Sequence, residues 1–268
     1  MTIPEVHLWS GETGEATPAD AAVLSAAERA RAARFADPVE SGHYVGAHAR
    51  VRRILARYLE CGAAEIEFGR HACPGCGDTR HGRPAITAPA TGISFNHSRC
   101  GPFWVLAVAP GGERVGVDVE RVRPLAAFDG LLARCLTARE RRWVLRGGAT
   151  EHPGRFLRCW VRKEALLKGV GTGIATDLTQ VETVAGADFG GLRALDLPLG
   201  PRLVGCVAVE PSRRAVPSPS AVPAPGSPQA ASHQKVQLPD SSTEPKKYGE
   251  RLVILGTGIT DLRAPTHR

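Results

Sequence analysis

Polar and apolar residues alternate along residues 115–120, which read Val-Gly-Val-Asp-Val-Glu. A period of two predicts a β-strand with one apolar face and one polar face. On the polar face, Asp118 and Glu120 would lie side by side next to Gly116. We expect this glycine to let a ligand approach the backbone closely.

A second pattern lies downstream, in residues 160–169. Apolar residues recur there at helical spacing, and Trp160, Glu164 and Lys168 are four positions apart. Residues at this spacing share one face of a helix. Together with the strand, this helix would bring three carboxylates and a lysine to one point. Such a group is suited to holding a hard divalent cation against a phosphate.

The rest of the chain to residue 210 predicts further helices and strands. Ser25 is suited to cap a helix, and Thr137-x-x-Glu140 is a capping box. Residues 70–91 are expected to form a loop rich in Cys, Gly, Pro and His. We expect strands at 6–9, 64–69, 93–96, 104–109, 178–184 and 203–209, and helices at 25–35, 43–59, 137 onward and 153–168.

The sequence carries an internal echo. Residues 24–29 resemble residues 136–141, and other apolar pairs recur at the same offset. Helices rich in Ala and Arg also resemble one another by composition alone, but the fixed offset argues against that explanation. We therefore expect an α/β (α+β) fold of two similar halves, 1–112 and 113–210, related by a pseudo-two-fold axis, with the ligand site at the seam between them.

The composition changes at Pro211. Residues 211–232 contain six prolines and five serines, and Tyr248 is the one aromatic residue of 211–268. A segment of this composition buries too little apolar surface to fold alone, so we expect a disordered tail. Its eight basic and four acidic residues give it a charge of +4, which leaves +3 for the rest of the chain. The expected folded part is therefore only mildly basic, and nucleic acid is not the expected partner.

Composition also bears on the compartment. No apolar run is long enough to cross a bilayer, and the first residues lack the basic and apolar regions of a signal peptide. The seven cysteines are scattered and odd in number, which argues against a disulfide framework: Cys61, Cys73, Cys76, Cys100, Cys135, Cys159 and Cys206. We expect a cytoplasmic monomer with no membrane association.

The two acidic motifs, taken together, resemble the signature of the Sfp-type 4'-phosphopantetheinyl transferases. That family has a G-[IV]-D-[IV]-E strand, followed some 40 residues later by W-x-x-K-E-[AS]-x-x-K. This chain matches the first at 116–120 and the second at Trp160, Lys163, Glu164, Ala165 and Lys168. The resemblance covers about residues 5–210 and includes nothing of the tail.

The resemblance implies a holo-[acyl-carrier-protein] synthase activity. Such enzymes transfer the 4'-phosphopantetheine of coenzyme A to a serine of an acyl or peptidyl carrier protein and release adenosine 3',5'-bisphosphate. Asp118, Glu120 and Glu164 would surround Mg²⁺, which also grips the pyrophosphate. Glu164 would take the proton of the incoming serine, directly or through water. Lys168 would face the leaving phosphate or orient Glu164.

The resemblance also implies a set of ligand contacts. The family usually reads F-N-x-S-H-S-G before the acidic strand, whereas this chain has His97 two positions early and Arg99 in place of the phosphate-contacting histidine. Arg99 is the substitute we expect, because a guanidinium binds phosphate as a fixed cation, and His97 is the alternative. The positions implied to contact coenzyme A are Arg31, His43, Arg83, Ser98, Arg99, Lys163 and Lys168.

A possible metal loop lies outside these motifs. His71, Cys73, Cys76 and His81 offer zinc-ligand types, including one CxxC pair. Four-ligand zinc sites normally bring two separated pairs, and the sequence has no second CxxC. We therefore interpret 70–91 as a loop with reduced cysteines and leave zinc as the alternative.

Two other functions could use some of the same residues. A catalytically impaired homologue would bind coenzyme A or a carrier protein without transfer, because of the change from His to Arg at position 99; the intact carboxylates and lysines speak against it. A Mg²⁺-dependent nuclease would also use clustered carboxylates, but the lysine-bearing helix motif and the small charge of residues 1–210 disfavour it. The sequence does not identify which carrier protein would be the partner.

Overall fold

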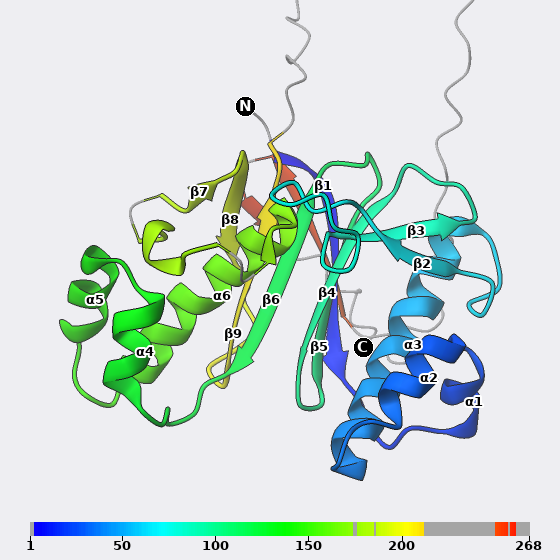
Figure 1. Ribbon diagram of the computed structural model, residues 1–268, viewed down its shortest axis with the longest axis horizontal. Helices are drawn as coiled ribbons and strands as arrows, with labels where there is room; N and C mark the ends of the chain where they lie inside the picture. Colours follow the sequence, from blue (N-terminus) through cyan, green and yellow to red (C-terminus); the bar gives the residue numbers. More distant parts are fainter. Residues whose placement is uncertain (1–2, 174–175, 185, 212–249, 257, 261–268) are drawn as a thin grey trace, which may run out of the picture.

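The computed structural model describes residues 3–173, 176–184, 186–211, 250–256 and 258–260. Within these residues, two larger β-sheets lie side by side, with helices on their outer sides (Figure 1). The strands of the first sheet follow the order β11-β10-β1-β5-β4, and those of the second the order β6-β9-β8-β7. The fold is a mixed α+β architecture, as the sequence predicts.

The first sheet is built mostly from the N-terminal part of the chain. Its strands are antiparallel, and its long helix α3 packs with α1 and α2. Side chains of α3 such as Ile54 and Leu55 share a core with Trp9, Trp104 and Leu106 of the sheet. Its elements are β1 (Ile3–Glu12), α1 (Pro18–Ala22), α2 (Ala26–Ala32), α3 (Pro38–Leu59), β4 (Ser94–Cys100), β5 (Phe103–Ala109), β10 (Glu250–Gly256) and β11 (Gly258–Thr260).

The second sheet carries both acidic motifs. The long helix α6 packs along β6 and β9, and its apolar side chains form a core with α4 and α5. Its elements are β6 (Val115–Arg121), α4 (Phe128–Cys135), α5 (Ala138–Leu145), α6 (His152–Val170), the 3₁₀ helix η2 (Leu178–Gln180), β7 (Asp188–Phe189), β8 (Leu192–Asp196) and β9 (Leu203–Val209).

A shared core joins the two sheets. Val115, Val117 and Val119 of β6 are buried, as the alternating pattern predicts, and pack with Val6, Leu8, Val105 and Ala107 of β1 and β5. This places the opposite face of β6 under α6. Strands β4 and β6 also adjoin, so polar residues of the first sheet come close to the acidic face of β6.

The helix cap expected at Ser25 and the capping box expected at Thr137 are both present, and the cap at Ser25 is also a capping box. Ser25 caps α2: its hydroxyl oxygen accepts a hydrogen bond from the Glu28 amide, and the Glu28 carboxylate accepts one from the Ser25 amide. Thr137 and Glu140 do the same for α5. These short motifs fix helix starts by satisfying amides that have no partner inside the helix, which explains why the sequence locates them well.

Three expectations are corrected. Residues 178–184 form η2 and a loop in place of a strand. The loop expected at 70–91 is interrupted by β3 (Pro84–Ala88), which pairs with β2 (Glu67–Arg70) in a sheet of two strands. The expected tail contributes β10 and β11, of which β10 pairs with β1 over Ile3 to Ser10. The other tail residues, 212–249, 257 and 261–268, lie outside the described part.

No helix in the described part of the chain combines the length and apolar character that crossing a bilayer requires.

Candidate functional site

Close packing between β6 and α6 brings the two acidic motifs together. A Cβ atom at Gly116 would overlap the carbonyl oxygen of Ala165 and the amide of Gly169, both on α6. The glycine is therefore needed so that the helix backbone can lie directly on the strand. This corrects the expectation that Gly116 gives a ligand access to the backbone.

Asp118 stands at the centre of the resulting polar cluster. Its carboxylate is buried, and its Oδ1 accepts hydrogen bonds from Lys168 Nζ at 2.6 Å and from Ser98 Oγ at 2.8 Å. Lys168 Nζ also donates to Ser98 Oγ at 3.1 Å. Residues from β4, β6 and α6 thus meet at one carboxylate, and the predicted Ser98, Asp118 and Lys168 are in direct contact.

Glu120 and Glu164 extend this cluster. Burial raises the pKa of each carboxyl group, and the negative charge of Asp118 raises both further. Buried oxygens of Asp118 (Oδ2) and Glu164 (Oε1) have no hydrogen-bond partner among the residues that the structure describes. Two orphaned oxygens among carboxylates that repel one another form an electrostatically unfavourable arrangement, which a cation would relieve.

The donor chemistry fits a hard divalent cation such as Mg²⁺, which prefers carboxylate oxygens. The oxygens of the three carboxylates are nevertheless not all close enough to one another to bind the same ion. Among the residues that the structure describes, the group of three candidate ligands whose atoms all lie within 4.8 Å of one another is Cys73, Cys76 and His81. Binding of a cation at the carboxylates would therefore need some movement of their side chains, with Lys168 giving up part of its contact with Asp118.

Successive residues of β4 point to opposite faces of the strand. Asn96, Ser98 and Cys100 face β6: Asn96 Oδ1 accepts from the Val117 amide at 3.2 Å, and the Cys100 thiol lies 3.5 Å from Glu120 Oε2. These contacts repeat every second residue, as a strand requires. Asn96 and Cys100 were not among the predicted site residues, although the alternation along 94–100 was the signal that would have identified them.

His97 lies on the other face of β4 and lines a cavity of about 570 Å³. Burial, together with the nearby His48 and Lys168, lowers the pKa of His97 to about 3, so its imidazole is neutral at physiological pH. Its Nδ1 is buried and has no hydrogen-bond partner within the described part of the chain. The other lining residues are Glu28, His48, Phe68, Gly69, Arg70, Thr79, Pro84, Thr87 and Phe95. Of these, none was predicted from the sequence as a site residue.

Arg99 shares the His97 face of β4 but reaches different partners. Its guanidinium donates to Glu40 Oε2 at 3.0 Å and lies over the rings of Phe35 and Tyr44. The neighbouring His43 contacts the other oxygen of Glu40 at 3.3 Å. The structure therefore places Arg99 and His43 in one group near the start of α3, away from the carboxylate that binds Lys168.

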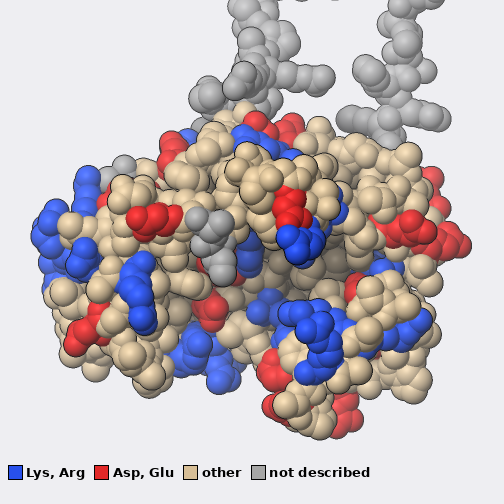
Figure 2. All heavy atoms as spheres, viewed as in Figure 1, with Lys and Arg blue, Asp and Glu red and all other residues tan. Residues whose placement is uncertain are grey.

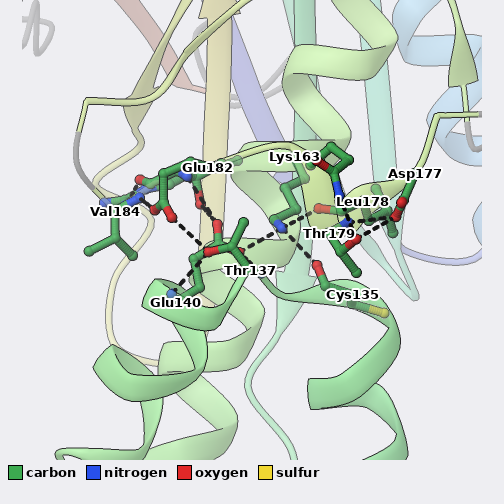
Figure 3. Close-up of polar contacts among 12 residues, drawn as sticks. Cys135, Thr137, Glu140, Lys163, Asp177, Leu178, Thr179, Glu182 and Val184 are labelled. Carbon is green, nitrogen blue, oxygen red and sulfur yellow. Dashed lines mark hydrogen bonds and ion pairs between the residues drawn. The ribbon is translucent and has the colours of Figure 1, made fainter.

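Lys163 differs from its expected role. Its ammonium is fully buried and forms a 2.6 Å ion pair with Glu140, and it donates to the carbonyls of Cys135 and Leu178 (Figure 3). Glu140 also accepts hydrogen bonds from Thr183. This position ties α6 to α5 and η2, so the ligand contact expected of Lys163 is replaced by a structural one.

The remaining predicted contacts are more scattered. Arg31 is exposed on α2. Arg83 is partly buried, and a Cβ at Gly171, just beyond α6, would lie 2.8 Å from its Cγ. The segment carrying Arg83 therefore contacts the end of the helix that bears Glu164 and Lys168. In Figure 2, charged side chains of both signs surround a hollow at the centre of the visible face.

Comparison with known proteins gives one consistent result. Residues 114–191, which include both acidic motifs, match the model of the 4'-phosphopantetheinyl transferase superfamily. The 4'-phosphopantetheinyl transferase HetI of Nostoc sp. is 33% identical over 177 residues, which cover 64% of this chain and 70% of HetI. A phosphopantetheinyl transferase of Thraustochytrium sp. is 29% identical over 212 residues, which cover 72% and 69% of the two chains.

A third relative, from Synechocystis sp., is named provisionally as a 4'-phosphopantetheinyl transferase. It is 26% identical over 182 residues, which cover 67% of this chain and 70% of the relative. These matches extend well beyond the short motifs, over about two thirds of each chain.

Proposed function

Because the chain belongs to the 4'-phosphopantetheinyl transferase superfamily, we propose that it moves the 4'-phosphopantetheine group of coenzyme A to a serine of an acyl or peptidyl carrier protein. Phosphopantetheinyl transfer to carrier proteins is the activity of the family. Coenzyme A as donor, Mg²⁺ as cofactor and the residues below are our proposals. We further expect the protein to act as a cytoplasmic monomer.

The observation that supports this site best is the meeting of β4, β6 and α6 at Asp118. Its Oδ1 is held by Ser98 and Lys168, while Glu120 and Glu164 complete an acidic group with raised pKa values. We propose that this group lies at the seam between two halves, 1–112 and 113–210, related by a pseudo-two-fold axis. The pyrophosphate of coenzyme A would bind there.

Asp118, Glu120 and Glu164 are the proposed Mg²⁺ ligands, and the ion would supply positive charge beside the pyrophosphate oxygens. In the reaction, the serine Oγ of the carrier forms a bond to the β-phosphorus, and the bond from that phosphorus to the bridging oxygen breaks. Adenosine 3',5'-bisphosphate leaves with the bridging oxygen. The serine proton passes to a carboxylate, for which we propose Glu164, directly or through water.

Lys168 is the proposed partner of the phosphate oxygens. Its Nζ donates hydrogen bonds to Asp118 and Ser98, and its side chain is about one third exposed. A phosphate arriving beside it would receive a hydrogen bond from a preplaced cation, which stabilises charge that develops in the transition state. Ser98 would hold Lys168 in place from the β4 side.

The nucleotide part of coenzyme A needs a second region. We propose the face of β4 that carries His97 and Arg99, with Arg31, His43 and Arg83 around it. The cavity beside His97 supports this placement. Arg99 remains our choice for the phosphate contact, because the pKa of His97 is lowered to about 3 and a neutral imidazole attracts phosphate weakly.

The test is a mass spectrum of carrier proteins after reaction. The purified chain is mixed with coenzyme A, Mg²⁺ and a panel of apo carrier proteins, with EDTA in parallel. We expect a phosphopantetheine adduct on at least one carrier that disappears with EDTA. The Glu164→Gln variant should lose on the order of 100-fold or more in rate, as is typical when a charge-stabilising group is removed.

The matched control is Glu151→Gln, which removes an exposed carboxylate from the start of the same helix, where it pairs only with Arg155 among the described contacts. It should keep a rate near that of the original protein. A near-normal rate for Glu164→Gln would overturn the site. No adduct on any carrier, with coenzyme A still bound, would instead support a protein that binds coenzyme A without transferring its pantetheine arm.

A further inference from the structure

Three sulfur and nitrogen ligands converge in the segment between β2 and β3. Cys73, Cys76 and His81 each place one ligand atom so that all lie within 4.8 Å of one another. Cys76 Sγ is 3.2 Å from His81 Nε2. In a tetrahedral zinc site, ligand atoms lie roughly 3.5–3.8 Å apart, given metal–ligand bonds of about 2.0–2.3 Å. The cluster is thus already close to the size that one ion requires.

The backbone of residues 73–78 holds this arrangement. The Gly77 amide donates to the Cys73 carbonyl at 2.8 Å, and the Cys73 amide donates to the Asp78 carbonyl at 2.9 Å. Gly77 has a φ of +76°, a conformation that glycine adopts without strain. A tight, internally bonded turn therefore presents both cysteines of the CxxC pair toward His81.

The same turn leaves one side of the cluster open. The amides of Gly75 and Cys76 hydrogen-bond to the Cys73 sulfur from the protein side. Cys73 is the buried member of the set, whereas Cys76 and His81 are exposed. The open side leaves room for a further ligand from solvent.

We propose that Cys73, Cys76 and His81 bind one Zn²⁺ ion, with a fourth position open to solvent. Two thiolates and an imidazole are typical zinc ligands and are poor ligands for Mg²⁺. This site is therefore chemically distinct from the carboxylate group of β6 and α6. The proposal also differs from the reduced, metal-free loop that the sequence favours. A second CxxC pair is not needed, because the loop places the His81 imidazole beside the first pair.

The position of the loop suggests what the metal does. Strands β2 and β3 form a sheet of their own, and a hairpin of two strands is marginally stable by itself. The connection between them, residues 71–83, is long for a hairpin. A metal that joins Cys73 to His81 would close this connection and lower the entropy that folding must remove.

The metal would also fix Arg83. His81 is two residues before it, the His71 amide donates to the Arg83 carbonyl at 2.9 Å, and Arg70 donates to the Gly82 carbonyl at 2.8 Å. Arg83 in turn contacts Gly171 at the end of α6. Zinc would therefore act as a structural support for a residue beside the transfer site, a consequence that rests on the proposed function.

The test measures metal content, so its result does not depend on transferase activity. The full chain is purified under reducing conditions, incubated with zinc sulfate, freed of loose metal on a chelating resin and analysed by elemental mass spectrometry. We expect one zinc per chain. Cobalt substituted for zinc should show the absorption of thiolate–cobalt charge transfer.

The informative variants are Cys76→Ser and His81→Asn, because both side chains are exposed and their loss leaves no core cavity. Each variant should bind zinc more weakly. Loss of a residue that only supports a metal ligand lowers metal affinity by roughly 10–100-fold, and loss of a ligand itself should lower it by more. Cys61→Ser, which changes a half-buried thiol outside the loop, should keep zinc. Zinc-free reduced protein, or zinc retained by both loop variants, would overturn the proposal, as would a Cys73–Cys76 disulfide that persists under reducing conditions.

Discussion

Two lysines of one helix illustrate how differently neighbouring residues are used. Lys163 and Lys168 both belong to the motif on α6, yet the first has no exposed surface and the second is about one third exposed. A rotation of about 100° per residue puts positions five apart on different faces of a helix. Lys163 therefore pairs with Glu140 of α5, and Lys168 pairs with Asp118 at the polar cluster.

The two lysines should respond differently to the same substitution. Lys163→Met leaves Glu140 buried without its cation and should lower the free energy of unfolding by about 3–5 kcal/mol. Lys168→Met should lower stability by less, because Lys168 is about one third exposed and Asp118 keeps its bond from Ser98, while the transfer rate falls on the order of 100-fold. Urea unfolding and the carrier assay measure the two effects. Equal stability of both variants would contradict the structural role of Lys163.

At the scale of elements, the site depends on how closely α6 lies on β6. Each element was predictable from its own period, since Val115, Val117 and Val119 are buried as expected and α6 spans the predicted helix. The contact between β6 and α6 was not predictable, because a glycine in a strand can indicate either ligand access or close packing. Only the three-dimensional arrangement shows that Gly116 faces Ala165 and Gly169.

Gly116→Ala should separate the strand from the helix. The added methyl group meets backbone atoms, which cannot turn aside as a side chain would, so we expect a loss of about 1–3 kcal/mol or more and a reduced transfer rate. Gly42→Ala is the matched control: it lies in helix α3 with free space around it and should stabilise the protein by about 0.5–1 kcal/mol. Thermal unfolding of both variants compares them. A Gly116 variant as stable as the original would refute the close packing.

At the scale of the whole molecule, local signals predicted more than long-range ones. The helix caps at Ser25 and Thr137 and the strand at 115–120 depend on nearby residues, and the structure has them. The pattern of residues 178–184 predicted a strand. In the structure, the amide and hydroxyl of Thr183 donate hydrogen bonds to the Glu140 carboxylate, and 178–184 pair with no strand in the described part of the chain. The sequence offered Cys73, Cys76 and His81 only as an alternative zinc site, because it does not show whether their ligand atoms converge. Strand β10 escaped prediction because its partner β1 is distant in sequence and the composition of the segment before it is typical of disorder.

Strand β10 has the largest consequence for the molecule as a whole. It pairs with β1 on the side opposite β5, so β1 is an interior strand of the first sheet and β10 covers one of its edges. An uncovered edge strand presents unpaired amides and carbonyls that other chains can bind. The C-terminal segment therefore contributes to the folded unit, although its composition near 211–232 resembles that of a disordered tail.

A chain that ends at Pro211 should test this contribution. Without β10, the backbone of β1 from Ile3 to Ser10 loses one line of partners, so we expect a lower melting temperature and a greater tendency to associate. The polar cluster at Asp118 is built from β4, β6 and α6, so the truncated chain should still transfer phosphopantetheine at temperatures where it remains folded.

The matched control ends at Thr260, which keeps β10 and β11 and removes only residues 261–268. Thermal unfolding and light scattering should show this shorter deletion to behave as the full chain does. If the chain ending at Pro211 melts at the same temperature and associates no more than the full chain does, β10 adds nothing to the first sheet in solution. If it instead loses transfer while remaining folded, the C-terminal segment also supports the site, and the first sheet positions β4 only when both edges of β1 are paired.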